Sequence, residues 1–249
     1  MAGSGTRRSR DATDTVAPAR LEGGTPIPWK RVQRTVCTLQ QRSSRASRRG
    51  EVSAVRTLQR LRMRSRSARL LAVRRVTQEN QGKKTAGVEG VKARTPPQRL
   101  AWVDTVRRGK RAQPVRRVGI PTPETTEQRP LGSPVRAARA LQALAKAARE
   151  PAWEARFAPN SYGFRPGRSC QDAIDAMCTA LGHTAPYALD ADMATCFDRS
   201  HHAALLTKVH PSPSLRRQLQ AWLKAGVRDH GQVFPTEEGT MQGGNRSPW

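Results

Sequence analysis

The chain has 249 residues, of which 45 are Lys or Arg and 19 are Asp or Glu, so its formal net charge is +26. Only 36% of the residues are hydrophobic, a low share for a chain that is packed throughout, and part of it is therefore expected to lie outside a folded core. No apolar run has the length of a membrane-spanning helix, and the N-terminus lacks the apolar stretch of a signal peptide. The four cysteines form no CxxC pair, which argues against a zinc finger or a disulfide scaffold and favours a reducing, cytoplasmic setting without a membrane.

The positive charge is confined to the N-terminal part of the chain. Residues 1–149 hold 35 basic and nine acidic side chains, whereas residues 150–249 hold ten of each. A one-sided field of this kind attracts polyanions, and each phosphate that it neutralises releases a counterion. Because the charge lies on periodic apolar segments, nucleic-acid binding is favoured. The alternatives are a solvated arm or a basic drift in a GC-rich coding sequence.

Residues 1–28 mix Gly, Ser, Thr, Pro and charge without periodicity, and this pattern predicts a disordered basic tail. A helical repeat of apolar residues begins at Trp29 and is broken at Gly50. A second repeat begins at Val52 and extends to Val76, which predicts one continuous helix. Basic residues occupy the other faces, so this pair of helices is suited to lying along an RNA or DNA backbone.

Residues 80–99 contain three glycines and two prolines and are expected to form a loop, followed by a short helix over Leu100–Val106. Val115–Ile120 and Arg129–Leu131 are expected to pair as a hairpin. The next helix is predicted from Val135 to Ala148, with Pro151 ending it.

The last hundred residues predict alternating short helices and strands. Ser169 and Asp172 resemble a capping box, Tyr187–Asp192 predicts a short strand, and Ser200 is expected to cap another helix. Ser212 and Pro213 open a further helix with its stop at Gly226, and residues 231–239 predict a hairpin. The pattern is that of an α+β fold.

Two carboxylates at the end of the predicted strand are the sharpest chemical feature. Asp190 and Asp192 would point to the same side of the strand, as a magnesium site requires. The alternative is a pair of exposed acids, since DxD is short and common. The Gly-rich segment 239–244 lacks the spacing of a P-loop and is either a nucleotide-contacting loop or an ordinary turn. In the loop 161–169, two aromatics beside Arg165 and Arg168 form either a phosphate cradle or an ordered loop.

Together, these segments resemble the reverse transcriptase of group II intron-encoded proteins, the maturases. The resemblance rests on four collinear stretches, WEARFAPNSYGFRPGRSCQDAI, YALDADMATCFDRSHHAALL, WLKAGV and GTMQGG, with RRVGIP and RPLGSP in the N-terminal half. It extends from Trp29 to Pro248. It implies an RNA-directed DNA polymerase with right-hand fingers over residues 29–150 and a partial palm over residues 151–249. It also implies intron RNA, a DNA primer or target, and dNTP as partners.

The resemblance assigns roles residue by residue. Asp192 would be the first catalytic carboxylate and a Mg²⁺ ligand, and Phe197 would be the gate that crowds a ribose 2′-hydroxyl. Arg129 would meet the triphosphate, and Gln242 with Gly243 would line the nucleotide pocket. The candidate nucleic-acid contacts are Lys30, Arg31, Arg34, Arg74, Arg75, Lys83, Lys84, Arg165 and Arg168.

The sequence also departs from the family pattern. Thr122 stands where the hairpin has Lys, Ser133 where it has an apolar residue, and Met241 where it has Pro. The Tyr-Ala-Asp-Asp turn, which supplies two further carboxylates, is absent from the 249 residues. One carboxylate cannot hold two Mg²⁺ ions, so this chain is expected to be truncated and inactive alone. The alternatives are a non-catalytic basic RNA-binding fragment or a decaying reading frame.

Overall fold

A computed structural model describes residues 27–80, 95–108, 112–121, 128–183, 187, 189–194 and 196–240. Within these residues the fold is α+β, with eight α-helices and one four-stranded sheet. The predicted α+β class is confirmed. The predicted tail falls almost wholly on residues 1–26, outside the described part of the chain. All four cysteines are exposed free thiols.

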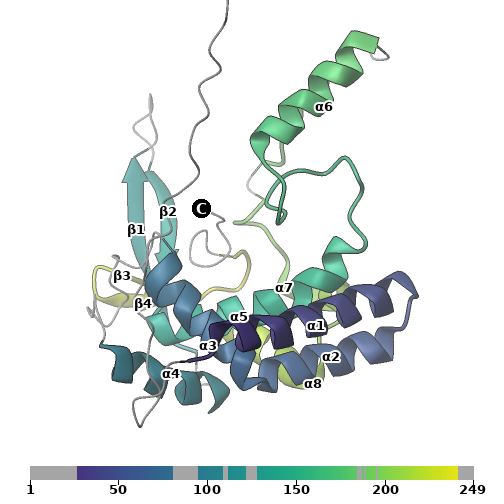
Figure 1. Ribbon diagram of the computed structural model, residues 1–249. Coiled ribbons are helices and arrows are strands. Elements are labelled where there is room, and N and C mark those ends of the chain that lie inside the picture. The colour runs from purple at the N-terminus through teal and green to yellow at the C-terminus, as the bar shows by residue number, and fades with distance from the viewer. Residues whose placement is uncertain are drawn as a thin grey trace, which may run out of the picture.

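The first half of the described chain is a helical layer (Figure 1). Helix α1 spans Trp29–Arg48 and α2 spans Val52–Arg64, and the chain turns between them at Gly50, which has a φ of 73°. This turn is where the sequence pattern placed it. Helix α3 follows over Arg66–Arg74 and ends in one π-helical turn, Arg75–Glu79. Helix α4 spans Pro96–Arg108 and includes the predicted short helix.

The continuous helix predicted from Val52 to Val76 is wrong. The chain breaks at Ser65, whose ψ of 125° is extended, and the Ser65 hydroxyl oxygen accepts a hydrogen bond from the Ala68 amide at 3.4 Å. A serine competes with the helix backbone for hydrogen bonds, and here it ends one helix and caps the next. The apolar repeat continues across the break, so it could not reveal it.

Helix α5, Arg136–Glu154, runs through the centre of the helical layer and packs against α1, α2, α3 and α4. The stop predicted at Pro151 is wrong, because Pro151 lies inside the last turn and is buried. The Ser47 hydroxyl donates to the Ala152 carbonyl at 2.8 Å, so the neighbouring helix supports this end of α5. The boundary expected between the fingers region (29–150) and the partial palm (151–249) falls within this helix and stays a prediction.

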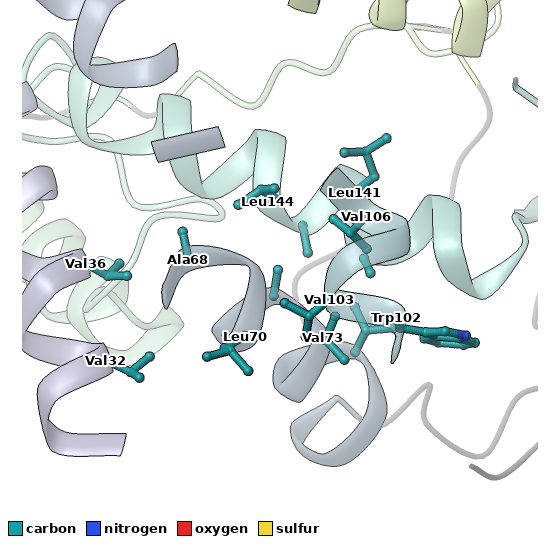
Figure 2. Packing of buried hydrophobic residues seen from close by; sticks show 14 of the residues in the cluster. Val32, Val36, Ala68, Leu70, Val73, Trp102, Val103, Val106, Leu141 and Leu144 are labelled. Carbon is teal, nitrogen blue, oxygen red and sulfur yellow. The ribbon is translucent and has the colours of Figure 1, made fainter. Parts of the chain in front are cut away.

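The main core is built where α1, α3, α4 and α5 meet, as Figure 2 shows. Val32 and Val36 of α1 are buried there, as their spacing predicted, together with Leu70 and Val73 of α3. Leu144 of α5 is the largest fully buried side chain. Most of the apolar burial that stabilises the described chain is therefore in its basic first half.

Several arginines lie inside this layer rather than on its surface. Arg69 is 5% exposed, and its Nη1 donates to the Val103 carbonyl at 3.0 Å. Arg62 is 4% exposed, and burial lowers its pKa to about 10. The expectation that the basic residues fill only the outer faces is therefore wrong for these two. A long stem with a donor-rich end can span a helix interface and meet its carbonyls.

The sheet has the strand order β2-β1-β3-β4. Strands β1 (Val115–Pro121) and β2 (Gln128–Ser133) form the predicted antiparallel hairpin, with Val118 opposite Leu131. Strands β3 (Val227–Asp229) and β4 (Gln232–Phe234) form a second hairpin, and β3 pairs with β1 in parallel. This hairpin was predicted a few residues later in the chain, over 231–239.

The remaining helices are α6 (Cys170–His183), α7 (His202–Val209) and α8 (Pro213–Leu223). Ser169 and Asp172 form the predicted capping box, with the Asp172 amide donating to the Ser169 hydroxyl and the Ser169 amide donating to the carboxylate. Ser212 precedes Pro213 at the start of α8, also as predicted. Helix α6 projects away from the other helices in Figure 1.

Candidate functional site

The segment with Asp190 and Asp192 is exposed and is not a strand. The strand predicted over Tyr187–Asp192 is therefore wrong. A strand needs a partner for its backbone, and none of the described strands pairs with this segment. Tyr187 is 89% exposed and Leu189 93% exposed, so burial does not stabilise a strand here either.

Asp192 lies in this exposed segment, outside any helix or strand. Its Oδ1 accepts a hydrogen bond from the Met193 amide at 2.7 Å. Among the described residues, no group of three or more His, Cys, Asp or Glu is placed to hold a metal ion. The Asp192 carboxylate therefore lies at the surface, where the backbone amide of the next residue is its hydrogen-bond donor.

Five residues further on, the chain is joined to the Gly-rich segment by three hydrogen bonds. The Thr240 amide donates to the Phe197 carbonyl at 2.6 Å, and the Gly239 amide donates to the Ser200 carbonyl at 2.9 Å. The third bond links Nε2 of His202 to the Gly239 carbonyl at 2.7 Å. A carbonyl can only accept, so the His202 ring carries its proton on Nε2. We call the residues 197–202 and 239–240 the clamp.

The clamp depends on a glycine at position 239. Gly239 has a φ of +78°, and a Cβ there would lie 2.5 Å from the Asp198 carbonyl oxygen. Both the positive φ and the close approach require a residue without a side chain. The sequence predicts only that glycines in segment 239–244 let the backbone approach a nucleotide closely. It does not predict that Gly239 and His202 hold this segment against the Phe197 turn, because these contacts join residues that are far apart in the sequence.

A cavity of about 250 Å³ opens beside the clamp. Asp198, Gly239 and Thr240 line it together with Arg117 of β1 and Phe234 of β4. Arg117 also lies 3.6 Å from the Asp229 carboxylate of β3. The cavity is therefore lined both by the clamp and by the first hairpin, two regions that only the family resemblance links in the sequence.

The start of α7 differs from its prediction. The Ser200 hydroxyl donates to the Cys196 carbonyl at 2.6 Å instead of capping the helix. The cap is His201, whose Nδ1 accepts from the Ala204 amide at 3.3 Å. Ser200 does not cap the helix because its hydroxyl is engaged by the Cys196 carbonyl, and its own carbonyl accepts a hydrogen bond from the Gly239 amide of the clamp.

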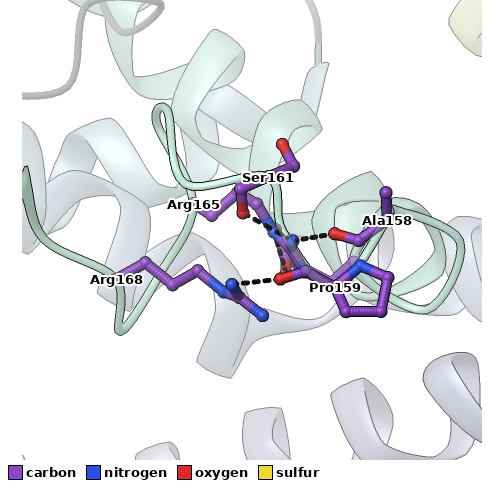
Figure 3. A network of polar contacts seen from close by, with 6 residues as sticks. Ala158, Pro159, Ser161, Arg165 and Arg168 are labelled. Carbon is purple, nitrogen blue, oxygen red and sulfur yellow. Dashed lines mark hydrogen bonds and ion pairs between the residues drawn. The ribbon is translucent and has the colours of Figure 1, made fainter. Parts of the chain in front are cut away.

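Arg165 is used inside the loop that follows α5, as Figure 3 shows for part of its contacts. Its side chain is 8% exposed and lies 3.0 Å from the Glu154 carboxylate. Its Nη1 donates to the carbonyls of Ala158 and Ser161, each at 2.8 Å. These contacts leave Arg165 little capacity to meet a phosphate, so we leave it out of the proposed binding set. Arg168 donates to the Pro159 carbonyl and lies over the Tyr162 ring at 5.0 Å.

The N-terminal basic candidates fall into two groups. Lys30, Arg31 and Arg34 of α1 are exposed, and none of them forms an ion pair with a described carboxylate. Arg74 instead contacts Glu79 at 2.7 Å and lies over the Trp29 ring at 4.6 Å. Arg75 is half-buried.

Other predicted residues lie outside the described part of the chain. They are Lys83, Lys84, Gln242 and Gly243, together with Thr122 and Met241. The backbone of Arg129 is in β2, opposite Ile120, but its side chain is outside the described part. Ser133 is described, and its hydroxyl accepts a hydrogen bond from Arg139 Nη2 at 2.6 Å. A polar residue at this position therefore has a partner in α5.

The fold and the clamp place family motifs in one connected region, and comparison with known proteins agrees with the resemblance. The family model for the N-terminal domain of reverse transcriptase matches residues 25–106. The model for reverse transcriptase (RNA-dependent DNA polymerase) matches residues 120–249. The chain therefore belongs to the reverse transcriptase family, and its resemblance to the group II intron-encoded members is confirmed.

Curated relatives support the same family. Over 187 residues the chain is 35% identical to Protein YkfC of Escherichia coli (strain K12), an alignment that covers 70% of this chain and 49% of the relative. Over 139 residues it is 32% identical to the group II intron-encoded protein LtrA of Lactococcus lactis subsp. cremoris, covering 55% of this chain and 23% of LtrA. The chain thus spans about half the length of the first relative and about a quarter of the second.

No helix in the described ranges has the length and apolar character needed to cross a bilayer.

Proposed function

We propose that this chain forms the fingers and the first part of the palm of an RNA-directed DNA polymerase encoded by a group II intron. The observation that carries the proposal is the clamp. Its hydrogen bonds fix the Phe197 turn against Gly239 and Thr240, so two segments of the family pattern form one surface. Intron RNA, a DNA primer or target, dNTP and a cytoplasmic setting belong to the same proposal.

In this proposal, Asp192 is the first catalytic carboxylate and Phe197 the residue that selects the sugar. Asp192 is exposed, and Phe197 is 43% exposed, so both are accessible to a bound substrate. Arg129, Gln242 and Gly243 keep the nucleotide-binding roles that the resemblance gives them. The proposed contribution of the clamp is to hold the Phe197 turn at a fixed distance from the Gly-rich segment.

The described residues do not fit a two-metal magnesium site. Reverse transcriptases normally use a divalent metal ion. Within the described ranges, however, no three potential ligands come together, and a carboxylate pair or more is needed to hold two hard cations. We therefore derive no step through the metal, and Asp192 as a Mg²⁺ ligand stays a prediction.

The experiment is RNA-templated primer extension with the chain supplied together with a separate C-terminal polypeptide that carries the Tyr-Ala-Asp-Asp turn of the family. Asp192→Asn is expected to abolish any synthesis, because removing this charge removes the group that the proposal places at the reacting phosphate. Asp190→Asn is the matched control, since it removes an equally exposed carboxylate two residues away. Synthesis that survives Asp192→Asn, or that is abolished equally by both substitutions, would contradict the assignment.

The second candidate function is RNA binding without catalysis. It is favoured by the exposed cations Lys30, Arg31 and Arg34 on α1, which have no ion-pair partner among the described residues. Unpaired surface cations are free to neutralise phosphates along a nucleic-acid backbone. RNA-binding measurements on variants distinguish the two functions. Substitutions on α1 are expected to weaken RNA binding, whereas Asp192→Asn is expected to leave it unchanged.

A further inference from the structure

A second open cavity, of about 260 Å³, lies where α2, the end of α5 and the end of α7 meet. Arg56 and Gln59 of α2 line it, with Arg149, Trp153 and Arg156 from α5 and the turn that follows it, and Lys208 of α7. The volume is enough for several water molecules or a small polar ligand. It is separate from the cavity beside the clamp, since the two cavities share no described lining residue.

Among the described residues that line this cavity, all the charge is positive. Arg56, Arg149, Arg156 and Lys208 are all cations at neutral pH, and no Asp or Glu is among the lining residues. Four cations gathered around one space repel one another unless an anion joins them. The ion pairs of the described chain do not include any of the four.

Two of the residues that line this cavity each carry a buried polar atom without a hydrogen-bond partner in the described part of the chain. Nη1 of Arg149 is buried without a hydrogen bond, and so is Oε1 of Gln59, whose side chain belongs to a residue only 6% exposed. An unsatisfied buried polar atom costs about 1–3 kcal/mol, so native proteins rarely keep one without a ligand or water to meet it. Burial also lowers the pKa of Arg149 to about 10, as expected for a cation without an acid beside it.

Arg149 is held in position by its other contacts. Its Nη2 donates to the Val209 carbonyl at 2.6 Å, which fixes the end of α7 against α5. The guanidinium lies 6.0 Å from the Trp153 ring. Because these groups come from helices and are already placed, little ordering would be needed when a ligand binds.

We propose that this cavity is a binding site for a phosphate group, with the lining cations donating to its oxygens and Gln59 accepting from a neighbouring hydroxyl. The ligand is either a small free phosphate compound or one phosphate of an RNA strand. Arginine and lysine together match this chemistry, because the guanidinium supplies directed donors and the ammonium a point charge. The phosphate site does not depend on polymerase activity. The proposal of a phosphate site can therefore be overturned while the proposed polymerase function stands, and the proposed function can be overturned while the phosphate site stands.

The test uses the full chain and isothermal titration calorimetry with pyrophosphate at low and at physiological ionic strength. The double variant Arg156→Gln with Lys208→Gln removes two lining cations while leaving Arg149 and its bond to Val209 intact. The control double variant is Arg216→Gln with Arg217→Gln, which changes the net charge equally on exposed positions of α8 that do not line the cavity. Circular dichroism confirms that both variants remain folded.

The first double variant is expected to weaken pyrophosphate binding by at least about tenfold, because two cations no longer donate charge-assisted hydrogen bonds to the ligand. The control double variant is expected to change it by less than about twofold, since Arg216 and Arg217 do not line the cavity and salt screens the attraction of charges that do not contact the ligand. Equal weakening in both double variants would show diffuse attraction to a basic protein and overturn the proposal. Absence of pyrophosphate binding by the unsubstituted chain would also overturn it.

Competition with a short single-stranded RNA identifies the source of the phosphate. If pyrophosphate displaces the RNA from the unsubstituted chain, the site takes a phosphate of the RNA strand. If both bind together, it takes a free phosphate compound. In either case, the difference between the two double variants supports the site.

Discussion

The backbone amide of Thr240 donates to the carbonyl of Phe197 across 2.6 Å, and this bond joins two segments that are far apart in the sequence. Gly239 reinforces the junction through its own amide, which bonds to Ser200, and through its carbonyl, which meets His202. Backbone groups carry two of the three bonds completely, so the side chains of the two segments remain available. The junction therefore orders the candidate site without using most of its polar side chains.

Gly239→Ala is expected to separate the two halves of the clamp. The new Cβ would meet the Asp198 carbonyl oxygen at 2.5 Å, and the φ of +78° alone disfavours a side chain by about 1–2 kcal/mol. Gly231→Ala is the matched control, since its φ is +88° and its Cβ would meet nothing within 4 Å. Hydrogen exchange at the Thr240 amide measures the effect. Equal acceleration in both variants would show that the close approach has no part in it.

Arg165→Ala is expected to lower the free energy of unfolding by about 2–3 kcal/mol, because it leaves Glu154 and two backbone carbonyls without their charged donor. Urea denaturation measures this change. Arg199→Ala, at an exposed position that forms no ion pair with the described residues, is the control and is expected to change stability by less than about 0.5 kcal/mol. An Arg165→Ala variant of unchanged stability and reduced RNA affinity would return this residue to the nucleic-acid-binding set.

The triple variant Lys30→Gln, Arg31→Gln, Arg34→Gln is expected to bind single-stranded RNA more weakly and with a shallower salt dependence. For a single strand, the slope of log affinity against log salt falls by about 0.7 for each phosphate that the protein no longer neutralises. Fluorescence anisotropy across a salt series measures the slope. Substituting Arg216 and Arg217 instead removes charge from α8 and should leave the slope nearly unchanged. An identical slope in the triple variant would remove α1 from the binding surface.

Phe197→Ala is expected to relax discrimination against ribonucleotides in RNA-templated primer extension with the complementing C-terminal half. The larger side chain is proposed to crowd the 2′-hydroxyl, and removing it opens that space. The readout is the ratio of dNTP to rNTP incorporation, with Phe157→Ala as a control at an aromatic residue of similar exposure, 45% against 43%. An unchanged ratio would contradict the role given to Phe197.

The cap of α6 is expected to weaken in acid. Hydrogen bonds from the Ser169 hydroxyl and amide lower the pKa of Asp172 from 3.8, so its charged form stabilises the folded state. This contribution is present above 3.8 and disappears as the pH falls through the lower folded-state pKa. Hydrogen exchange in the first turn of α6 should therefore accelerate below that pH. Asp172→Asn should remove the acid transition, and its persistence would assign it to another group.

The sequence by itself was sufficient for features that depend on neighbours along the chain. Val32 and Val36 are spaced to face one core, Gly50 supplies the turn after α1, and Ser169 with Asp172 caps α6. The first hairpin also formed where its alternation and turn residues placed it. Local propensity and periodicity decide such features because the interacting groups are only a few residues apart.

The sequence prediction was wrong where a single residue or a missing partner decided the outcome. Ser65 divides a helix whose apolar repeat is continuous, and packing against α1 and α2 carries α5 past Pro151. The segment before Asp192 has the composition of a strand, yet no described strand pairs with it. A strand is stabilised by the neighbouring strand with which it pairs, and the composition of a segment does not reveal whether such a neighbour is present.

The family motifs, and with them Asp192 and Phe197, were readable from the sequence because their order and spacing are specific. Only the tertiary structure decided that Gly239 and His202 fasten the Phe197 turn, that Arg165 belongs to Glu154, and that four cations surround one cavity beside α5. Each of these is a contact between groups brought together by folding. Hydrogen bonds and charges act over a few ångströms in space, and the linear order of residues does not specify that distance.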